Sequence, residues 1–155
     1  MCIRDRLEDC NTDSIILTGG PFRNARAVDE FTEDVASRLE KYNLAHMADY
    51  LVSNYGKQTD AILETFESSE EQDTEVRLGL SELRFTSEQE AVHSLLDFFE
   101  RRTGRLYFNI QSVRDLRASV SAYMSEFFQW TDERIAHEQA WLDRAIELAT
   151  DFEKK

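Results

Sequence analysis

The feature that most limits the folds open to this chain is the scarcity of residues that interrupt helices. One proline and five glycines occur among 155 residues, so an architecture of many short strands joined by tight turns is disfavoured. Apolar residues recur at spacings of three and four along most of the chain, which is the period of one face of an α-helix. The sequence therefore predicts a mainly α, bundle-like domain of about six helices.

Six segments carry this helical period, and most of them have recognisable ends. Asn24 is the expected N-cap of the first, and Gly56 follows the second as a residue suited to the left-handed end of a helix. Ser87 and Glu90 have the spacing of a capping box, for a helix that ends at Gly104. The expected helices cover residues 24–41, 44–55, 62–66, 87–102, 110–127 and 131–152.

Two short segments depart from the helical period. Ile15 to Leu17 has β-type residues and is followed by the turn residues Gly19, Gly20 and Pro21. The stretch LGLSELRF, residues 78–85, partly follows period two, and we expect a short strand there. The expected fold is thus a helical domain with a short N-terminal β segment.

The size and charge of the chain argue against several classes of function. A length of 155 residues with 41% apolar residues predicts one globular domain that needs no disulfide or metal to support its core. The formal net charge of -13 repels phosphate backbones and anionic lipids, which argues against direct binding of nucleic acid. No run of about 18 apolar residues occurs, so no transmembrane segment is expected. Cys10 is the one cysteine outside the first six residues, which fits a reducing cytoplasm.

The first six residues, MCIRDR, have neither an apolar period nor a helix cap. The apolar segment of a signal peptide does not follow them. They resemble the in-frame translation of a transposon end from a sequencing library. We therefore expect residues 1–6 to be a non-native leader, a sequencing artefact, and leave them out of the fold prediction.

One pair of residues has the spacing of a metal site. Glu90 and His93 form the Glu-x-x-His pattern of carboxylate-bridged di-iron bundles, but such a site needs a second copy of the pattern and two more glutamates. On the helix expected there, both side chains project away from the apolar face that contains Val92. A capping glutamate and a surface histidine are therefore preferred to a pair of metal ligands.

Other catalytic patterns are missing from the sequence. It contains no Gly-x-Gly-x-x-Gly turn after a strand, no Walker loop and no Gly-x-Ser-x-Gly elbow. Gly19-Gly20 alone is too little to predict a phosphate cradle, and His46, His93 and His137 occur singly. The sequence thus assigns no catalytic, cofactor-binding or metal-binding residue.

Two charged residues are expected on or next to the apolar face of their helices. Arg102 shares a flank with Leu95 and Phe98, so its guanidinium needs a carboxylate, a backbone carbonyl or a missing domain. Glu138 interrupts an apolar stripe and has two candidate partners, Arg134 on the same helix and Arg102 on another. We favour Arg134, because pairs four residues apart are the commoner arrangement.

Four blocks follow one another along the chain: LTGGPF, YGKQTDAIL, ELRFTSEQEAVHSLLDFFERRTGRLYFN and FFQWTDERIAHE. In this order they resemble the C-terminal helical domain of the family of FAD-dependent glycerol-3-phosphate dehydrogenases and α-glycerophosphate oxidases. The chain departs from the family at Phe85-Thr86-Ser87, where many relatives carry a tyrosine-alanine-valine run. The matching motif residues are Tyr55-Gly56, Asp97 to Thr103, Trp130, Arg134 and Glu138.

The resemblance implies a division of the chain into a leader at residues 1–6, a remnant of a preceding flavin domain at residues 7–22 and the C-terminal helical domain at residues 23–155. It implies that the whole parent protein oxidises sn-glycerol 3-phosphate to dihydroxyacetone phosphate by hydride transfer to FAD, and passes the electrons to a quinone or to oxygen. The partner of this fragment would be the missing flavin domain, which holds the FAD and the active site. The fragment alone is therefore expected to bind no cofactor and to be inactive.

The same resemblance implies a cytoplasmic location, with the parent peripheral at the cytoplasmic membrane and in contact with quinone there. A free-standing α-helical protein-interaction module is the alternative function. The sequence leaves open the electron acceptor, the oligomeric state and the contribution of the helical domain to turnover.

Overall fold

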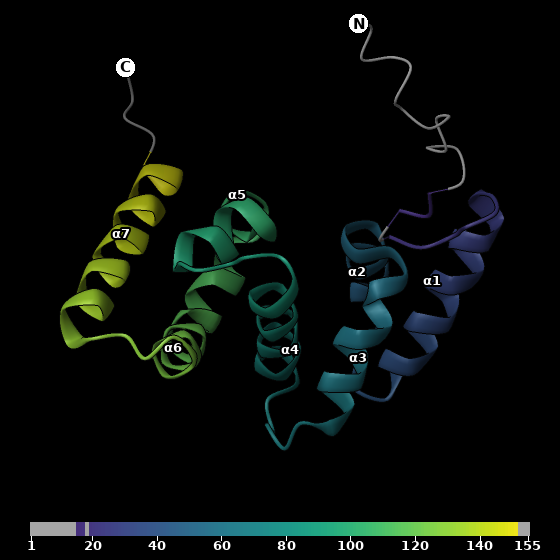
Figure 1. The fold of residues 1–155 in the computed structure, drawn as a ribbon, viewed down its shortest axis with the longest axis horizontal. Helices are drawn as coiled ribbons and strands as arrows, with labels where there is room; N and C mark the ends of the chain where they lie inside the picture. The colour runs from purple at the N-terminus through teal and green to yellow at the C-terminus, as the bar shows by residue number, and fades with distance from the viewer. Residues whose placement is uncertain (1–14, 18, 152–155) are drawn as a thin grey trace, which may run out of the picture.

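The structure is a computed structural model that describes residues 15–17 and 19–151, and its described residues form a helical domain (Figure 1). The predicted leader at residues 1–6, and Cys10, lie outside the described residues. The α-helices are α1 (Ala25–Glu40), α2 (Ala48–Tyr55), α3 (Thr59–Ser68), α4 (Thr74–Gln89), α5 (Arg105–Phe108), α6 (Ile110–Phe127) and α7 (Asp132–Thr150). Short 3-10 turns, η3 (Ala45–Met47) and η4 (Gly56–Gln58), flank α2, and a π-helix, η5 (Asp97–Arg102), precedes α5.

Helix α4 lies between two groups of helices. In Figure 1, α1, α2 and α3 lie on one side of it, and α5, α6 and α7 lie on the other. Each group has its own apolar core. Leu78 and Phe85 of α4 belong to the core of α1–α3, whereas Leu83 of α4 belongs to the core of η5, α6 and α7. Helix α4 is therefore shared by both cores.

The predicted helices at residues 24–41, 110–127 and 131–152 are confirmed as α1, α6 and α7. The Asn24 side chain accepts a hydrogen bond from the backbone N–H of Ala27 at 3.0 Å, and Thr131 accepts one from Arg134 at 3.3 Å. These side chains satisfy donors that the first turn of a helix leaves unpaired. The helix predicted at residues 44–55 is present as η3 followed by α2, and the one predicted around residues 62–66 begins earlier, as α3.

The strand predicted over residues 78–85 is wrong, because these residues lie inside α4. Asp73 caps this helix by accepting hydrogen bonds from the backbone N–H groups of Glu75 at 3.0 Å and Val76 at 3.2 Å. The prediction failed because α4 is buried on two sides, so its apolar residues do not form one stripe. Over a short window, apolar residues on two flanks resemble the period of a strand.

The capping box predicted at Ser87 and Glu90 is also wrong. Ser87 lies in the last turn of α4, and Ala91 then turns the chain with a φ of 56°. The next helix begins after Ser94, whose hydroxyl accepts a hydrogen bond from a backbone N–H three residues later. The predicted end of that helix is confirmed, because Gly104 adopts the left-handed conformation that stops it.

The segment Ile15–Leu17, predicted to be β-type, is not a strand, and residues 15–17 and 19–151 contain no strand. The chain instead turns through Gly19 and Gly20 onto the end of α2. The backbone N–H of Lys57 donates a hydrogen bond to the carbonyl oxygen of Gly19 at 2.8 Å. Gly56 permits this approach, because a Cβ at that position would lie 2.1 Å from the Gly19 oxygen.

We expect Gly56→Ala to destabilise the domain more than Gly104→Ala. Both glycines have positive φ. Gly104 is in the left-handed α conformation, where a side chain costs about 1–2 kcal/mol, whereas Gly56, with a ψ of -132°, lies outside the left-handed region expected for it and in backbone space that other residues avoid. Only at Gly56 would the added Cβ also meet a backbone atom, since a Cβ at Gly104 would meet the side chain of Phe108 at 3.2 Å. Urea unfolding of both variants measures the difference, and equal losses would contradict the close approach of Gly19.

Candidate functional site

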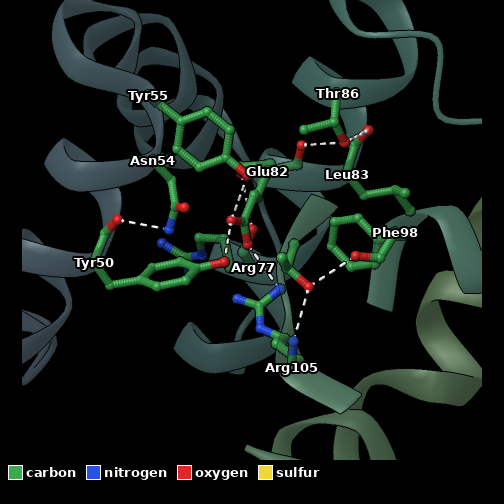
Figure 2. A network of polar contacts seen from close by, with 11 residues as sticks. Tyr50, Asn54, Tyr55, Arg77, Glu82, Leu83, Thr86, Phe98 and Arg105 are labelled. Atoms are coloured by element: carbon green, nitrogen blue, oxygen red, sulfur yellow. Dashed lines mark hydrogen bonds and ion pairs between the residues drawn. The ribbon is translucent and has the colours of Figure 1, made fainter. Parts of the chain in front are cut away.

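A carboxylate without solvent exposure lies where the two groups of helices meet. Glu82 of α4 is 0% exposed. Its Oε1 atom accepts hydrogen bonds from the hydroxyl of Tyr50 at 2.6 Å and from the hydroxyl of Tyr55 at 2.7 Å. Figure 2 shows the two phenol rings, both from α2, converging on this carboxylate. Two hydrogen bonds to a charged acceptor therefore join α2 to α4.

The other oxygen of the same carboxylate pairs with an arginine from the second group of helices. Nη1 of Arg105, the first residue of α5, lies 2.7 Å from Oε2 of Glu82. The Arg105 guanidinium also lies against the rings of Tyr50 and Phe98. A buried charge is tolerated when it is both paired and hydrogen-bonded. We call Tyr50, Tyr55, Glu82 and Arg105 the central cluster.

Burial determines the protonation of the central cluster. Burial, together with the neighbouring Glu82 carboxylate, raises the pKa values of Tyr50 and Tyr55 well above the usual range of phenols. Burial by itself would lower the pKa of Arg105, but the Glu82 carboxylate facing it outweighs that effect, and the pKa of Arg105 is raised. At neutral pH the two tyrosines are therefore hydrogen-bond donors and Arg105 is a cation.

Glu90 and Arg102 form a second ion pair, next to the central cluster. The Arg102 guanidinium donates to the Glu90 carboxylate and lies over the ring of Tyr55, 4.9 Å from its centre. Burial raises the pKa of Glu90, against the lowering effect of Arg102. Of the three kinds of partner expected for Arg102, the structure supplies a carboxylate, that of Glu90, directly after α4.

Glu138 pairs with Arg134 at 2.6 Å, as predicted, and not with Arg102. The pair differs from an ordinary surface pair, because Glu138 is 1% exposed whereas the Arg134 side chain is 47% exposed. The second oxygen of Glu138 accepts a hydrogen bond from the backbone N–H of Leu95 at 2.9 Å. Glu138 of α7 thereby caps the helix that leads into η5, where the helix dipole favours a negative charge.

A groove of about 590 Å³ opens beside the Glu90–Arg102 pair. It is lined by the incoming Gly19-Gly20 turn, by Asn54 near the end of α2 and by Gln58 of η4. Arg102 is already neutralised by Glu90. The groove therefore presents no uncompensated positive charge to an anionic ligand.

The residues considered as metal ligands in the sequence do not converge on one point. Glu90 is bound by Arg102, whereas the exposed ring of His93 lies against Phe128 at 5.3 Å. Within residues 15–17 and 19–151, no group of three or more His, Cys, Asp or Glu side chains is arranged to hold a metal ion. His46 is exposed, and His137 lies against a tryptophan of its own helix.

Sequence reasoning missed the central cluster. Tyr50 and Tyr55 lie in the helix predicted at residues 44–55, with no polar role assigned to them, and Glu82 lies inside the wrongly predicted strand. One signal was available in the sequence. If residues 74–89 are placed on a helix, Glu82 falls among apolar positions such as Leu78 and Leu83, and a carboxylate there requires a partner.

Residues 10–135 match the family model for the C-terminal domain of alpha-glycerophosphate oxidase. Aerobic glycerol-3-phosphate dehydrogenases from Staphylococcus aureus strains RF122 and MRSA252 are each 28% identical to the chain over 142 residues, which cover 90% of the chain and 26% of their own length. The structure of the glycerol-3-phosphate dehydrogenase from Bacillus halodurans complexed with FAD matches with a TM-score of 0.79 and 32% identity, over 96% of this chain and 31% of that one. The chain thus spans about a quarter, 26%, of the length of these curated relatives.

Glu82→Gln should destabilise the domain strongly. The substitution keeps the shape of the side chain but leaves Arg105 buried without its counter-ion, and breaking a buried pair costs about 3–5 kcal/mol. Glu88→Gln on the same helix is the matched control, because Glu88 forms an exposed pair with Arg84 and such pairs contribute about 1 kcal/mol or less. Urea unfolding compares the two variants, and similar losses would show that Glu82 does not hold a buried charge.

The stability of the domain should fall as the pH rises above about 10, the ordinary pKa of a tyrosine in an unfolded chain. The raised pKa values of Tyr50 and Tyr55 mean that the folded state keeps two protons that the unfolded state releases there, and linkage then lowers the free energy of unfolding. Urea unfolding from about pH 8 to about pH 11 measures the decline. The double variant Tyr50→Phe/Tyr55→Phe should show a shallower slope, and an unchanged slope would refute this origin.

Proposed function

This chain belongs to the family of the C-terminal domain of alpha-glycerophosphate oxidase, and from that membership we propose that it is the helical C-terminal part of an FAD-dependent enzyme that oxidises sn-glycerol 3-phosphate to dihydroxyacetone phosphate. The observation that carries the proposal is the likeness of 96% of the chain to a glycerol-3-phosphate dehydrogenase complexed with FAD. In this reaction the secondary alcohol of the substrate loses a hydride and a proton. In the parent protein FAD would supply the hydride acceptor, and the two electrons would then go to a quinone or to oxygen.

We assign the FAD to the part of the parent protein that this chain does not contain. Neither the Gly19-Gly20 turn nor the start of α1 fits the phosphate groups of a dinucleotide, which need free backbone N–H groups at a glycine-rich turn or a helix start. The Gly19-Gly20 turn instead directs the Gly19 carbonyl at the N–H of Lys57. The start of α1 is capped by Asn24, whose side chain accepts the N–H of Ala27. No reaction step is therefore assigned to residues of this chain.

The chain in this proposal is a structural domain and the preceding flavin domain is its partner. We place the protein in the cytoplasm, with the parent peripheral at the cytoplasmic membrane if quinone is its electron acceptor. Within residues 15–17 and 19–151, none of the helices has the length and hydropathy needed to cross a bilayer. Contact with quinone would then occur through the parent protein at the membrane surface.

The alternative, a free-standing helical interaction module, explains the surface less well. Phe108 is 90% exposed, and Tyr107 beside it is 62% exposed. Adjacent exposed aromatic side chains mark a contact surface. The matched family model describes a C-terminal domain, so the domain that precedes it in the longer protein is a partner already attached to this surface through the chain.

The proposal is tested on the full-length protein, expressed from its longer reading frame, in parallel with the 155-residue chain. We expect the full-length protein to carry one FAD per chain, seen as flavin absorbance, and to reduce a dye with sn-glycerol 3-phosphate. The 155-residue chain should do neither. Parallel assays with a soluble quinone and with oxygen identify the acceptor. A full-length protein without flavin, or flavin bound by the 155-residue chain, would refute the proposal.

A further inference from the structure

The large apolar side chains that the domain exposes are unevenly distributed. Most of those in the described residues come from three segments: the incoming segment before Gly19, helix α5 and the last turns of α7. In Figure 1 these three segments lie along one edge of the molecule, the upper edge in that view. We call the exposed apolar residues of these segments the apolar edge: Ile15, Ile16, Leu17, Tyr107, Phe108 and Leu148.

Helix α5 presents its two aromatic residues in a fixed direction. Arg105 and Leu106, its first two residues, are buried, and Arg105 is held by the ion pair of the central cluster. Since α5 is a single turn, anchoring these two residues directs the last two, Tyr107 and Phe108, toward solvent. The hydroxyl of Tyr107 also donates a hydrogen bond to Glu100 at 2.6 Å. The aromatic pair is therefore preorganised, which lowers the entropy cost of a contact.

The attachment point of any preceding domain lies on the same edge. The incoming segment is held by the hydrogen bond from Lys57 to the Gly19 carbonyl, at 2.8 Å. Ile15, Ile16 and Leu17 precede this point and are exposed. The curated relatives extend well beyond the matched region, which is 26% of their length. Leu17 lines the same groove as Arg102, which lies three residues before the start of α5. A domain joined to the chain at this segment would therefore reach α5 without a long linker.

We propose that the apolar edge is the surface on which the preceding flavin domain of the longer protein docks, with Tyr107 and Phe108 as its central contacts. This inference rests on the proposed function. Buried aromatic side chains dominate the energy of contacts between domains and subunits. A second copy of this chain is a poorer occupant, because each copy carries a formal charge of -13 and the copies repel each other.

Side-chain footprinting by photogenerated carbenes, read by mass spectrometry, tests the proposal on the full-length protein and on the 155-residue chain. Labelling of Tyr107 and Phe108 should fall severalfold in the full-length protein. Phe127 and Trp141 are exposed outside the apolar edge, and their labelling should stay the same. Equal labelling of Phe108 in both proteins, or protection confined to Trp141 and Phe127, would overturn the proposal.

A matched pair of variants separates docking from folding. Phe108→Ser and Trp141→Ser both alter side chains that are more than half exposed, so neither should change the urea midpoint of the 155-residue chain. In the full-length protein, Phe108→Ser should speed protease cleavage between the two domains, and Trp141→Ser should not. Equal cleavage rates for the two variants would contradict docking through α5.

Two further measurements distinguish docking of the flavin domain from self-association and from a failure of the proposed function. Protection of Phe108 that rises with the concentration of the 155-residue chain alone would assign the edge to a second copy and overturn the proposal. The flavin spectrum is recorded on the same full-length sample. Bound flavin with an accessible Phe108 overturns the docking surface alone, whereas a protected Phe108 without flavin supports the surface and refutes the proposed function.

Discussion

A carboxylate removed from water is stable only when donors surround it, and the placement of helices around Glu82 follows from that constraint. Its hydrogen-bond donors come from α2 on one side, and its counter-ion, Arg105, comes from α5 on the other. Each oxygen therefore has its partner only when the two groups of helices hold one relative position. Apolar contacts alone are not directional, so two apolar cores that meet at α4 would tolerate other positions. The buried charge makes the placement specific.

Several positions in the four sequence blocks that resemble the family serve the structure in the same way. Tyr55 donates to the central carboxylate, and Gly56 admits the incoming backbone. Arg102 neutralises a partly buried carboxylate, and Glu138 caps the helix that leads into η5. Each motif thus fixes one junction between elements distant in sequence. This agrees with the proposal that the flavin and the reacting groups belong to another part of the parent protein.

The sequence allowed prediction of those features that depend on local spacing. Helices α1, α6 and α7 have one buried face, so a single apolar stripe and a cap residue predict them. The Arg134–Glu138 pair was also predictable, because its members are four residues apart. Helix α4 was missed because it is buried on two sides. The central cluster was missed because Glu82 is 27 and 32 residues from its tyrosine partners, and only tertiary packing brings them together.

The central cluster also determines a feature of the surface. A helix of one turn is too short to be stable alone, so α5 depends on the burial of Arg105 and Leu106. The direction of Phe108 therefore depends on the charge of Glu82, although the two side chains have no shared partner. Apolar residues of equal volume in place of the ion pair would preserve the core but would lack its directional contact. The buried ion pair thus holds the aromatic residues of α5 in place, and for the proposed docking this means that this part of the surface is already formed before the flavin domain meets it.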